Sequence, residues 1–278
     1  MTTGFKASGI LTLTTDFGHQ GPFVATMKGR ILSRLPDARI VDITHEILVY
    51  WPAEAGFWLE KSFSYFPAGT VHVAVVDPGV GTRRNIILVV RDGHLFLAPD
   101  NGLLAPIVNR PVDKSSDAVP SLFRLDPQKL GRFALGPASA TFHGRDIFAP
   151  LAAELAAGRC RPDEIGVAIT EITPSWVDDP IDSGKQVTGI VMAIDHFGNL
   201  ITNIDGHRVQ RFRGPIVRTG NHEFPLHRTY GDARPGEYLA LINSFNVIEI
   251  ARAEQSAADG LGVGRGAPVS VVETISSR

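Results

Sequence analysis

Short apolar runs rich in Val, Ile and Leu recur along the chain, and several are separated by segments with helical spacing. The runs cover residues 10–15, 39–43, 70–76, 86–90, 94–98 and 188–194. Bounded runs of this length with few polar residues are typical of buried strands in a largely parallel sheet. Apolar residues at helical spacing fill 22–35, 52–63 and 147–157. This alternation predicts an α/β fold with a central, mostly parallel sheet.

The last third of the chain has a different pattern. Residues 174–186 contain two prolines and three aspartates, which indicates a linker. After it come short alternating runs with frequent Gly, Asn and Pro, typical of a smaller, mostly β domain. We therefore expect an N-terminal α/β domain over 1–173, a linker over 174–186 and a C-terminal domain over 187–278. The polar, proline-punctuated segment 106–132 is expected to be irregular.

Charge and cysteine content narrow the functional classes. The net charge of −2 gives no general attraction to nucleic acid or anionic membranes, so neither is an expected partner. No apolar run approaches the roughly 18 residues of a membrane-spanning helix, and we expect no secretory signal in the polar start of the chain. The single cysteine, Cys160, allows no intrachain disulfide. These features predict a cytoplasmic protein.

Four apolar runs end in an aspartate followed by glycine within three residues. The aspartates are Asp16, Asp77, Asp100 and Asp195. A single aspartate in such a position is more often a turn former or helix cap. In open α/β sheets, however, ligands bind beyond the carboxyl ends of the strands. The recurrence therefore favours a shared polar rim.

The segment VVDPGVGTRR (75–84) has the highest density of such signals. Its glycines allow the backbone to approach a ligand closely, and its arginines can reach back to Asp77. An Asp–Arg pair beside a ligand can orient and polarise a water molecule. The alternative is a surface salt bridge worth about 0–1 kcal/mol. The segment lacks the GK[ST] ending of a phosphate-binding P-loop.

A metal-dependent hydrolase is a competing interpretation of the acidic and histidine residues. The candidate ligand groups are Asp16/His19, Asp42/His45/Glu46, His143/Asp146 and Asp195/His196. The sequence has no HExxH motif and no cysteine cluster. In TFHGRDIFAP (141–150), Arg145 between His143 and Asp146 would repel a cation. We therefore favour a reaction without a metal, with His143 as a candidate reactive group.

IDHFGNLITNI (194–204) has the composition of a recognition loop. Phe197 offers a stacking surface, and the Asn199 amide can read a purine edge with one donor and one acceptor. The same residues are also compatible with an ordinary strand and turn.

Together these segments resemble one family, the SAM hydroxide adenosyltransferases. These are adenosine-forming hydrolases of S-adenosyl-L-methionine (SAM), related to the SAM-dependent fluorinases and chlorinases. The matching segments span nearly the whole chain, in the family's order. They are LTTDFG…FVATMKG (13–29), VDITHEI (41–47), FPAGTVHVAVVDPGVGTRR (66–84), APDNGLL (98–104), TFHGRDIFAPLAA (141–153), DHFGNLITNI (195–204) and NSF…EIA (243–251).

The resemblance implies an architecture and a reaction. It implies a C-terminal β-barrel-like domain and a homotrimer whose active sites lie between the N-terminal domain of one subunit and the C-terminal domain of the next. It also implies attack of water on the C5′ carbon of SAM, giving adenosine and L-methionine, with SAM as substrate and no cofactor or metal.

The resemblance further implies roles for particular residues. Asp77, Arg84 and His143 match the set that positions and activates the water, with Arg84 seven positions after the aspartate. The other matches concern substrate binding. Asp16 matches a carboxylate that binds the ribose hydroxyls, and Tyr50 or Trp51 matches a tryptophan that walls the ribose. Asn199 matches the amide that reads adenine, with Phe197 packed beside it. Asp195 matches a contact of the methionine ammonium, and Ser244 matches a contact at the methionine end.

Local departures bear on the alternatives. Asn246 and Val247 stand where the family often has a Gly–aromatic pair. In the halogenases the aspartate and histidine of the water-activating set are replaced, whereas both are present here, and Gly144 stands where the fluorinases have a serine that contacts fluoride. We therefore favour water over halide as the nucleophile. A chloride-using halogenase and a non-catalytic SAM or adenosine binder remain the alternatives.

Overall fold

The computed structural model describes residues 4–111, 119–133 and 135–274, and the chain divides into two compact units, 1–176 and 177–278. The division falls inside the segment 174–186, where we expected a linker. Part of that segment forms the short strand β8 (Ile181–Asp182), which pairs with β9 (Gln186–Ile194). No helix in the described ranges has the length and apolar character needed to cross a membrane.

Unit 1 is built on a central sheet. Among the described residues, seven strands follow the order β2-β1-β3-β5-β4-β6-β7. Their bounds are β1 Ile10–Thr15, β2 Arg39–Thr44, β3 Val71–Val75, β4 Ile86–Arg91, β5 His94–Pro99, β6 Ser121–Leu125 and β7 Gly166–Ile169. The pairs β2–β1, β1–β3 and β3–β5 are parallel, so the predicted mostly parallel sheet is confirmed.

Strand β4 runs antiparallel to β5, and its connection explains why. The two strands are joined by Asp92 and Gly93, whose φ angles of 50° and 78° are both left-handed. This backbone is typical of a two-residue hairpin, for which Asp-Gly is a preferred sequence. An apolar run alone does not reveal strand direction, but this dipeptide does.

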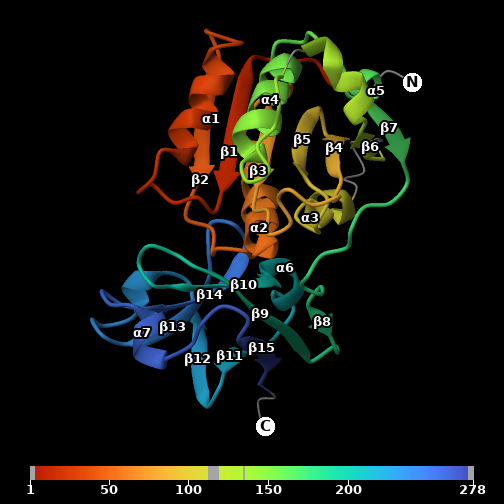
Figure 1. Ribbon diagram of the computed structural model, residues 1–278. Coiled ribbons are helices and arrows are strands. Elements are labelled where there is room, and N and C mark those ends of the chain that lie inside the picture. Colours follow the sequence, from red (N-terminus) through yellow and green to blue (C-terminus); the bar gives the residue numbers. More distant parts are fainter. Residues whose placement is uncertain (1–3, 112–118, 134, 275–278) are drawn as a thin grey trace. The chain divides into compact units, whose positions relative to one another are not determined.

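Helices cover both faces of the unit 1 sheet (Figure 1). On one face, α1 (Phe23–Leu32) and α4 (Ala149–Ala156) lie side by side. On the other are α2 (Pro52–Ser62) and α3 (Ala105–Asn109). Successive residues of β4 face opposite sides of the sheet. Leu88 packs in the core beneath α1 and α4, and Val89 packs in the core beneath α2 and α3. Shorter helical elements are η1 Phe63–Tyr65, η2 Pro127–Phe133, the π-helix η3 Gly144–Phe148 and α5 Pro162–Ile165.

The prediction of an irregular segment over 106–132 is only partly right. Strand β6 lies inside it and pairs with β4 on one side and β7 on the other. Leu122 and Leu125 of β6 are buried, so a short apolar run was present between the prolines. Residues 112–118 of this segment lie outside the described residues.

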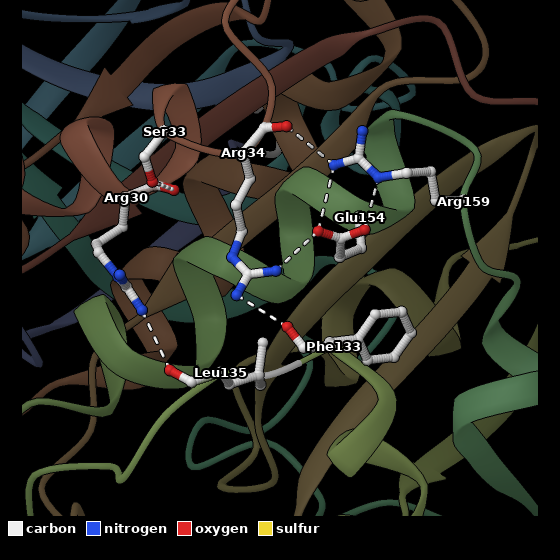
Figure 2. A network of polar contacts seen from close by, with 7 residues as sticks. All are labelled: Arg30, Ser33, Arg34, Phe133, Leu135, Glu154 and Arg159. Carbon is white, nitrogen blue, oxygen red and sulfur yellow. Dashed lines mark hydrogen bonds and ion pairs between the residues drawn. The ribbon is translucent and has the colours of Figure 1, made fainter.

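Figure 2 shows a network of polar contacts that joins α1 and the residues just after it to α4 and to the chain near residues 133–135. Glu154 on α4 is buried and accepts hydrogen bonds from Arg34 Nη1 at 2.9 Å and Arg159 Nε at 2.6 Å. Arg34 also donates to the carbonyl of Phe133 at 2.9 Å. The hydrogen bond from Arg159 is the main reason that the pKa of Glu154 lies below its usual value. This ionised carboxylate holds three segments together.

Unit 2 is a barrel. In the part of the chain that the structure describes, seven strands follow the order β9-β10-β14-β13-β12-β11-β15, and pairing of β9 with both β10 and β15 closes the ring. The remaining bounds are β10 Leu200–Asp205, β11 Pro215–Thr219, β12 His222–His227, β13 Tyr238–Ile242, β14 Val247–Arg252, β15 Pro268–Glu273, α6 Gly206–Val209, η4 Tyr230–Asp232 and α7 Ala257–Leu261. Val187, Val191 and Ile250 lie in its core. The predicted β-barrel-like domain is confirmed.

Candidate active site

Two of the predicted aspartates leave the sheet of unit 1 at the same edge. Asp16 directly follows β1, and Asp77 follows β3 by two residues. These strands are parallel neighbours, with Thr15 opposite Val75. Burial raises the pKa of Asp16 above its usual value, and the negative charge of Asp77 adds to this effect. The two carboxylates therefore lie close enough to influence one another.

Asp77, Arg84 and His143 form one continuous chain of contacts. Arg84 Nε donates to both carboxylate oxygens of Asp77, at 2.8 and 2.9 Å, and Arg84 Nη2 donates to Oδ2 as well. The same Nη2 lies 3.1 Å from His143 Nδ1. The Asp77 and Arg84 side chains are only 5% and 11% exposed. This is a shielded ion pair rather than the weak surface salt bridge considered above.

The contact between Arg84 and His143 fixes the protonation of the imidazole. A guanidinium can only donate, so Nδ1 must accept, and the ring proton of a neutral His143 then lies on Nε2. Burial lowers the pKa of His143, and the positive charge of Arg84 lowers it further. The imidazole is therefore neutral near pH 7, with an Nε2–H group to offer a ligand.

Local structure holds His143 in place. It caps the π-helix η3, and π-turns of this kind are frequently found at functional sites. Within η3, Asp146 accepts two hydrogen bonds from Arg145, at 2.7 and 2.9 Å, and one from the backbone N–H of Ser139 at 2.9 Å. Asp146 therefore braces the loop before His143 rather than acting with it on a ligand.

A hollow of about 250 Å³ opens at this edge of the sheet. Its lining includes Asp16, Asp77, His143 and Tyr50 but not Trp51, which precedes α2 as its N-cap. The other lining residues are Phe17, Phe23, Val49, Val75, Val80, Thr141, Phe142 and Gly144. Of the two open candidates for the ribose wall, only Tyr50 lies at this hollow.

Tyr50 has an unusual backbone. Its φ of 64° is left-handed, which is costly for an aromatic residue. In this conformation its N–H donates to Asp16 Oδ2 at 3.0 Å. The strained residue thus orients the carboxylate that we expect to bind the ribose.

An aromatic cluster that no sequence motif predicted lies in the wall of the hollow. Phe17, Phe23 and Phe142 pack against one another, with ring centroids 5.4 to 6.2 Å apart. Each stands beside or inside a quoted motif, such as Phe142 next to His143. Their position beside the motifs was a signal in the sequence, because small-molecule sites are lined mostly by apolar side chains with few polar groups.

In unit 2, Asp195 and Asn199 form a closed turn between β9 and β10. Asp195 Oδ1 accepts the backbone N–H groups of Phe197 and Asn199, both at 2.9 Å, and Oδ2 accepts Asn199 Nδ2 at 3.1 Å. Asn199 is buried, whereas Phe197 is 73% exposed. The turn therefore presents an aromatic ring to its surroundings above a fixed amide.

Ser244 is exposed in the turn between β13 and β14. Asn246, in the same turn, has a left-handed φ of 57°, and its Nδ2 donates to Asp205 Oδ1 at 2.9 Å. Asn tolerates this conformation better than most residues other than glycine. The departure from the family's glycine is therefore compatible with the same turn.

Asp100, the remaining aspartate of the expected rim, does not line the hollow. Its Oδ1 accepts the N–H of Thr173 at 2.8 Å, and its carbonyl accepts the Thr173 hydroxyl at 3.2 Å. Trp176 Nε1 donates to the neighbouring Asn101 carbonyl at 2.7 Å. Asp100 and Asn101 therefore hold the C-terminal end of unit 1 in place and do not bind a ligand at the hollow.

The structure does not favour the metal-dependent alternative. Across the described ranges, no three His, Cys, Asp or Glu side chains are grouped as a metal site would require. Two of the proposed ligands are instead bonded to cations: Asp42 to Lys28 at 2.5 Å, and Asp146 to Arg145.

Comparison with known proteins connects both units to one family. Residues 11–166 match the SAM hydroxide adenosyltransferase N-terminal domain, and 189–270 match the corresponding C-terminal domain. A relative from Thermus thermophilus, named (R)-S-adenosyl-L-methionine hydrolase, is 33% identical over 93% of this chain and 97% of its own. One of the same name from Salinispora tropica is 35% identical over 91% and 94%.

More distant relatives and solved structures agree with this placement. A fluorinase from Actinoplanes is 26% identical over 87% of this chain and 90% of its own. The crystal structure of an uncharacterized conserved protein from Thermotoga maritima superposes with a TM-score of 0.83, at 31% identity, and covers 95% of this chain and all of the other. The two domain matches together span most of the chain. The chain therefore belongs to the SAM hydroxide adenosyltransferase family.

Proposed function

We propose that this protein is an enzyme that hydrolyses SAM at the C5′–S bond, giving adenosine and L-methionine. The observation that supports this most directly is the bonded set of Asp77, Arg84 and His143, of which Asp77 and His143 line a hollow together with Asp16. Relatives at 31–35% identity over most of the chain carry the name (R)-S-adenosyl-L-methionine hydrolase.

In this reaction, the water oxygen forms a bond to C5′ while the C5′–S bond breaks. The bonding pair leaves with the sulfur, which changes from a sulfonium cation to the neutral thioether of methionine. The water loses one proton as it becomes the 5′-hydroxyl of adenosine. Because the leaving group departs neutral, it needs no acid catalyst. The demand on the protein is to supply and align a nucleophile from water, whose pKa is about 15.7.

The hydrogen bonds among Asp77, Arg84 and His143 support a division of this task among the three groups. Arg84 stabilises the negative charge that develops on the oxygen. His143, neutral with its proton on Nε2, donates a hydrogen bond that orients the water. The remaining acceptor is Asp77, which takes the proton. A base placed in this way typically contributes about 10²–10⁴ in rate, and alignment of the oxygen with C5′ contributes further.

Substrate binding draws on both units. Asp16 accepts the ribose hydroxyls, and Tyr50 walls the ribose. Asn199 reads the adenine edge, with Phe197 packed beside it. The methionine end is bound by Asp195, at the ammonium group, and by Ser244.

The site is complete when the N-terminal domain of one subunit meets the C-terminal domain of another, in a cytoplasmic homotrimer. The reaction needs no metal or other cofactor. The trimer and the absence of a cofactor are part of the proposal, and light scattering in solution tests the trimer directly.

One assay tests the function against its alternatives. The protein is incubated with each sulfonium epimer of SAM in ¹⁸O water, with and without chelator, and with excess chloride. We expect adenosine labelled at the 5′ oxygen, methionine, no effect of chelator, and faster turnover of the (R) epimer. Formation of 5′-chloro-5′-deoxyadenosine would assign a halogenase. Binding of SAM without any product would assign a non-catalytic binder and overturn the proposal.

A further inference from the structure

Glu249 is a buried carboxylate for which the proposed mechanism has no use. It lies in the middle of β14 and is 2% exposed. Tyr230 donates its hydroxyl to Oε1 at 2.6 Å, and Asn243 Nδ2 donates to Oε2 at 3.1 Å. A buried carboxylate held by two neutral donors is costly compared with an apolar residue. A charge kept in such a place is therefore a candidate for a specific task.

The turn between β13 and β14 is built around one of these donors. Asn243 Oδ1 accepts the backbone N–H groups of Phe245 at 3.0 Å and Val247 at 3.3 Å. The Asn243 backbone also bonds to Val247 and Asn246. Ser244 lies inside this set of bonds. The Asn243 side-chain amide thus helps to hold the backbone of the turn that carries Ser244.

Glu249 fixes the orientation of this amide. Its carboxylate can only accept, so it selects the rotamer in which Asn243 Nδ2 faces β14 and Oδ1 faces the turn. Burial is the main cause that raises the pKa of Glu249, and the negative charge of the nearby Asp195 raises it further. Glu249 therefore borders both turns of unit 2 that carry candidate substrate contacts.

We propose that Glu249 is a positioning residue, whose carboxylate sets the Asn243 amide and thereby the turn that presents Ser244 to the methionine end of SAM. This inference rests on the proposed function. It assigns no direct contact between Glu249 and the substrate. Its effect should therefore appear in substrate binding and leave the chemical step unchanged.

Exchanging the two polar groups tests the idea. Asn243→Asp alone sets two carboxylates against each other where the structure has a 3.1 Å hydrogen bond. Combining it with Glu249→Gln restores one donor and one acceptor in the reverse order, with an oxygen left for the Tyr230 hydroxyl. We expect Asn243→Asp to raise KM for SAM about tenfold or more, as for a buried polar group left mispaired, while kcat stays within about twofold. The double variant should recover most of the wild-type KM.

Controls separate this role from general destabilisation and from failure of the proposed function. Glu223→Gln makes the same change at an exposed ion pair of the barrel and should leave KM unchanged. Thermal melts establish that each variant is folded at the assay temperature. If the wild type turns over SAM but the double variant binds as poorly as Asn243→Asp, or if kcat falls in place of KM, the positioning role is wrong. If the wild type does not turn over SAM, the proposed function itself fails.

Discussion

The two units hold their candidate site residues in different ways. In unit 1, Asp77 and Arg84 are joined by one turn, and Arg84 bonds across the tertiary structure to His143, which lies 59 positions further along the chain. In unit 2, Asp195 and Asn199 bond within a single turn. Groups fixed by tertiary packing are preorganised for chemistry, whereas turns held by local bonds suit recognition. Substitutions in unit 1 should therefore act on kcat, and those in unit 2 on KM.

The largest effect is expected at the bonded set. Asp77→Ala, Arg84→Ala and His143→Ala should each lower kcat by about 10²–10⁴, with little change in KM, because each removes part of the set that we propose to activate water. Steady-state kinetics of adenosine release measures this. Arg83→Ala, at the exposed neighbouring arginine, is the matched control and should behave as wild type. Wild-type turnover in all three variants would remove the mechanism.

A substitution at Asp16 should affect both kcat and KM, although Asp16 belongs to unit 1. Asp16→Asn keeps the shape of the side chain but removes the negative charge of a carboxylate that accepts the Tyr50 N–H and that we propose to bind the ribose hydroxyls. A hydrogen bond to a charged group contributes about 1.5–3 kcal/mol, so kcat/KM should fall by roughly 10- to 100-fold. Because the ribose contact acts in both ground state and transition state, the loss should be shared between KM and kcat. A loss confined to kcat would instead place Asp16 with the water-activating groups.

Asn199 provides the sharpest contrast with the bonded set. Asn199→Ala should raise KM for SAM by about tenfold, the scale of one lost hydrogen bond to a buried partner, and leave kcat close to wild type. SAM titration with the wild type and variant gives both constants. A fall in kcat at unchanged KM would mean that unit 2 takes part in the chemistry.

The same contrast explains what the sequence could reveal. The proximity of Asp77 and Arg84 was open to prediction because one glycine-containing turn joins them. In that turn Gly81 has a φ of 78°, and a Cβ there would meet the Ala140 carbonyl at 2.3 Å. The approach of His143 depends on the π-helix and its packing, which no local pattern encodes. Only the resemblance to a family predicted it.

Other features were hidden because they depend on partners distant in sequence. Asp100 has the same local pattern as Asp16, yet it bonds to Thr173 instead of facing the hollow. Glu249 is the one charged residue in the otherwise apolar run 247–251, which is a signal of a buried polar role. Its donors could be identified only from the barrel that brings Tyr230 and Asn243 to it.

A smaller effect concerns the charge state of His143. The neutral ring accepts the hydrogen bond from Arg84, and its pKa is lowered by burial and then by that guanidinium. The neutral form dominates above the pKa, so kcat should persist below pH 6.5 and fall only at more acidic values. Arg84→Gln removes one cause of the lowering, so the pKa of His143 should rise. An NMR titration of the imidazole in both proteins measures this, and an unchanged or lower pKa in the variant would contradict it.

The smallest kinetic effect is expected at Glu154 of α4 and its partners Arg34 and Arg159, which lie away from both sets of candidate site residues (Figure 2). Glu154→Gln should lower the free energy of unfolding by about 1–3 kcal/mol, the scale of a buried hydrogen bond to a charged group, and leave kcat and KM unchanged. The pKa of this carboxyl is lowered in the folded state. Its contribution is therefore present above the unfolded-state pKa and lost as pH falls through the folded one. Thermal melts should show a gap between wild type and variant near neutral pH that closes in acid. A gap that persists in acid would mean that packing around Glu154, and not its charge, holds α4 to the segment after α1.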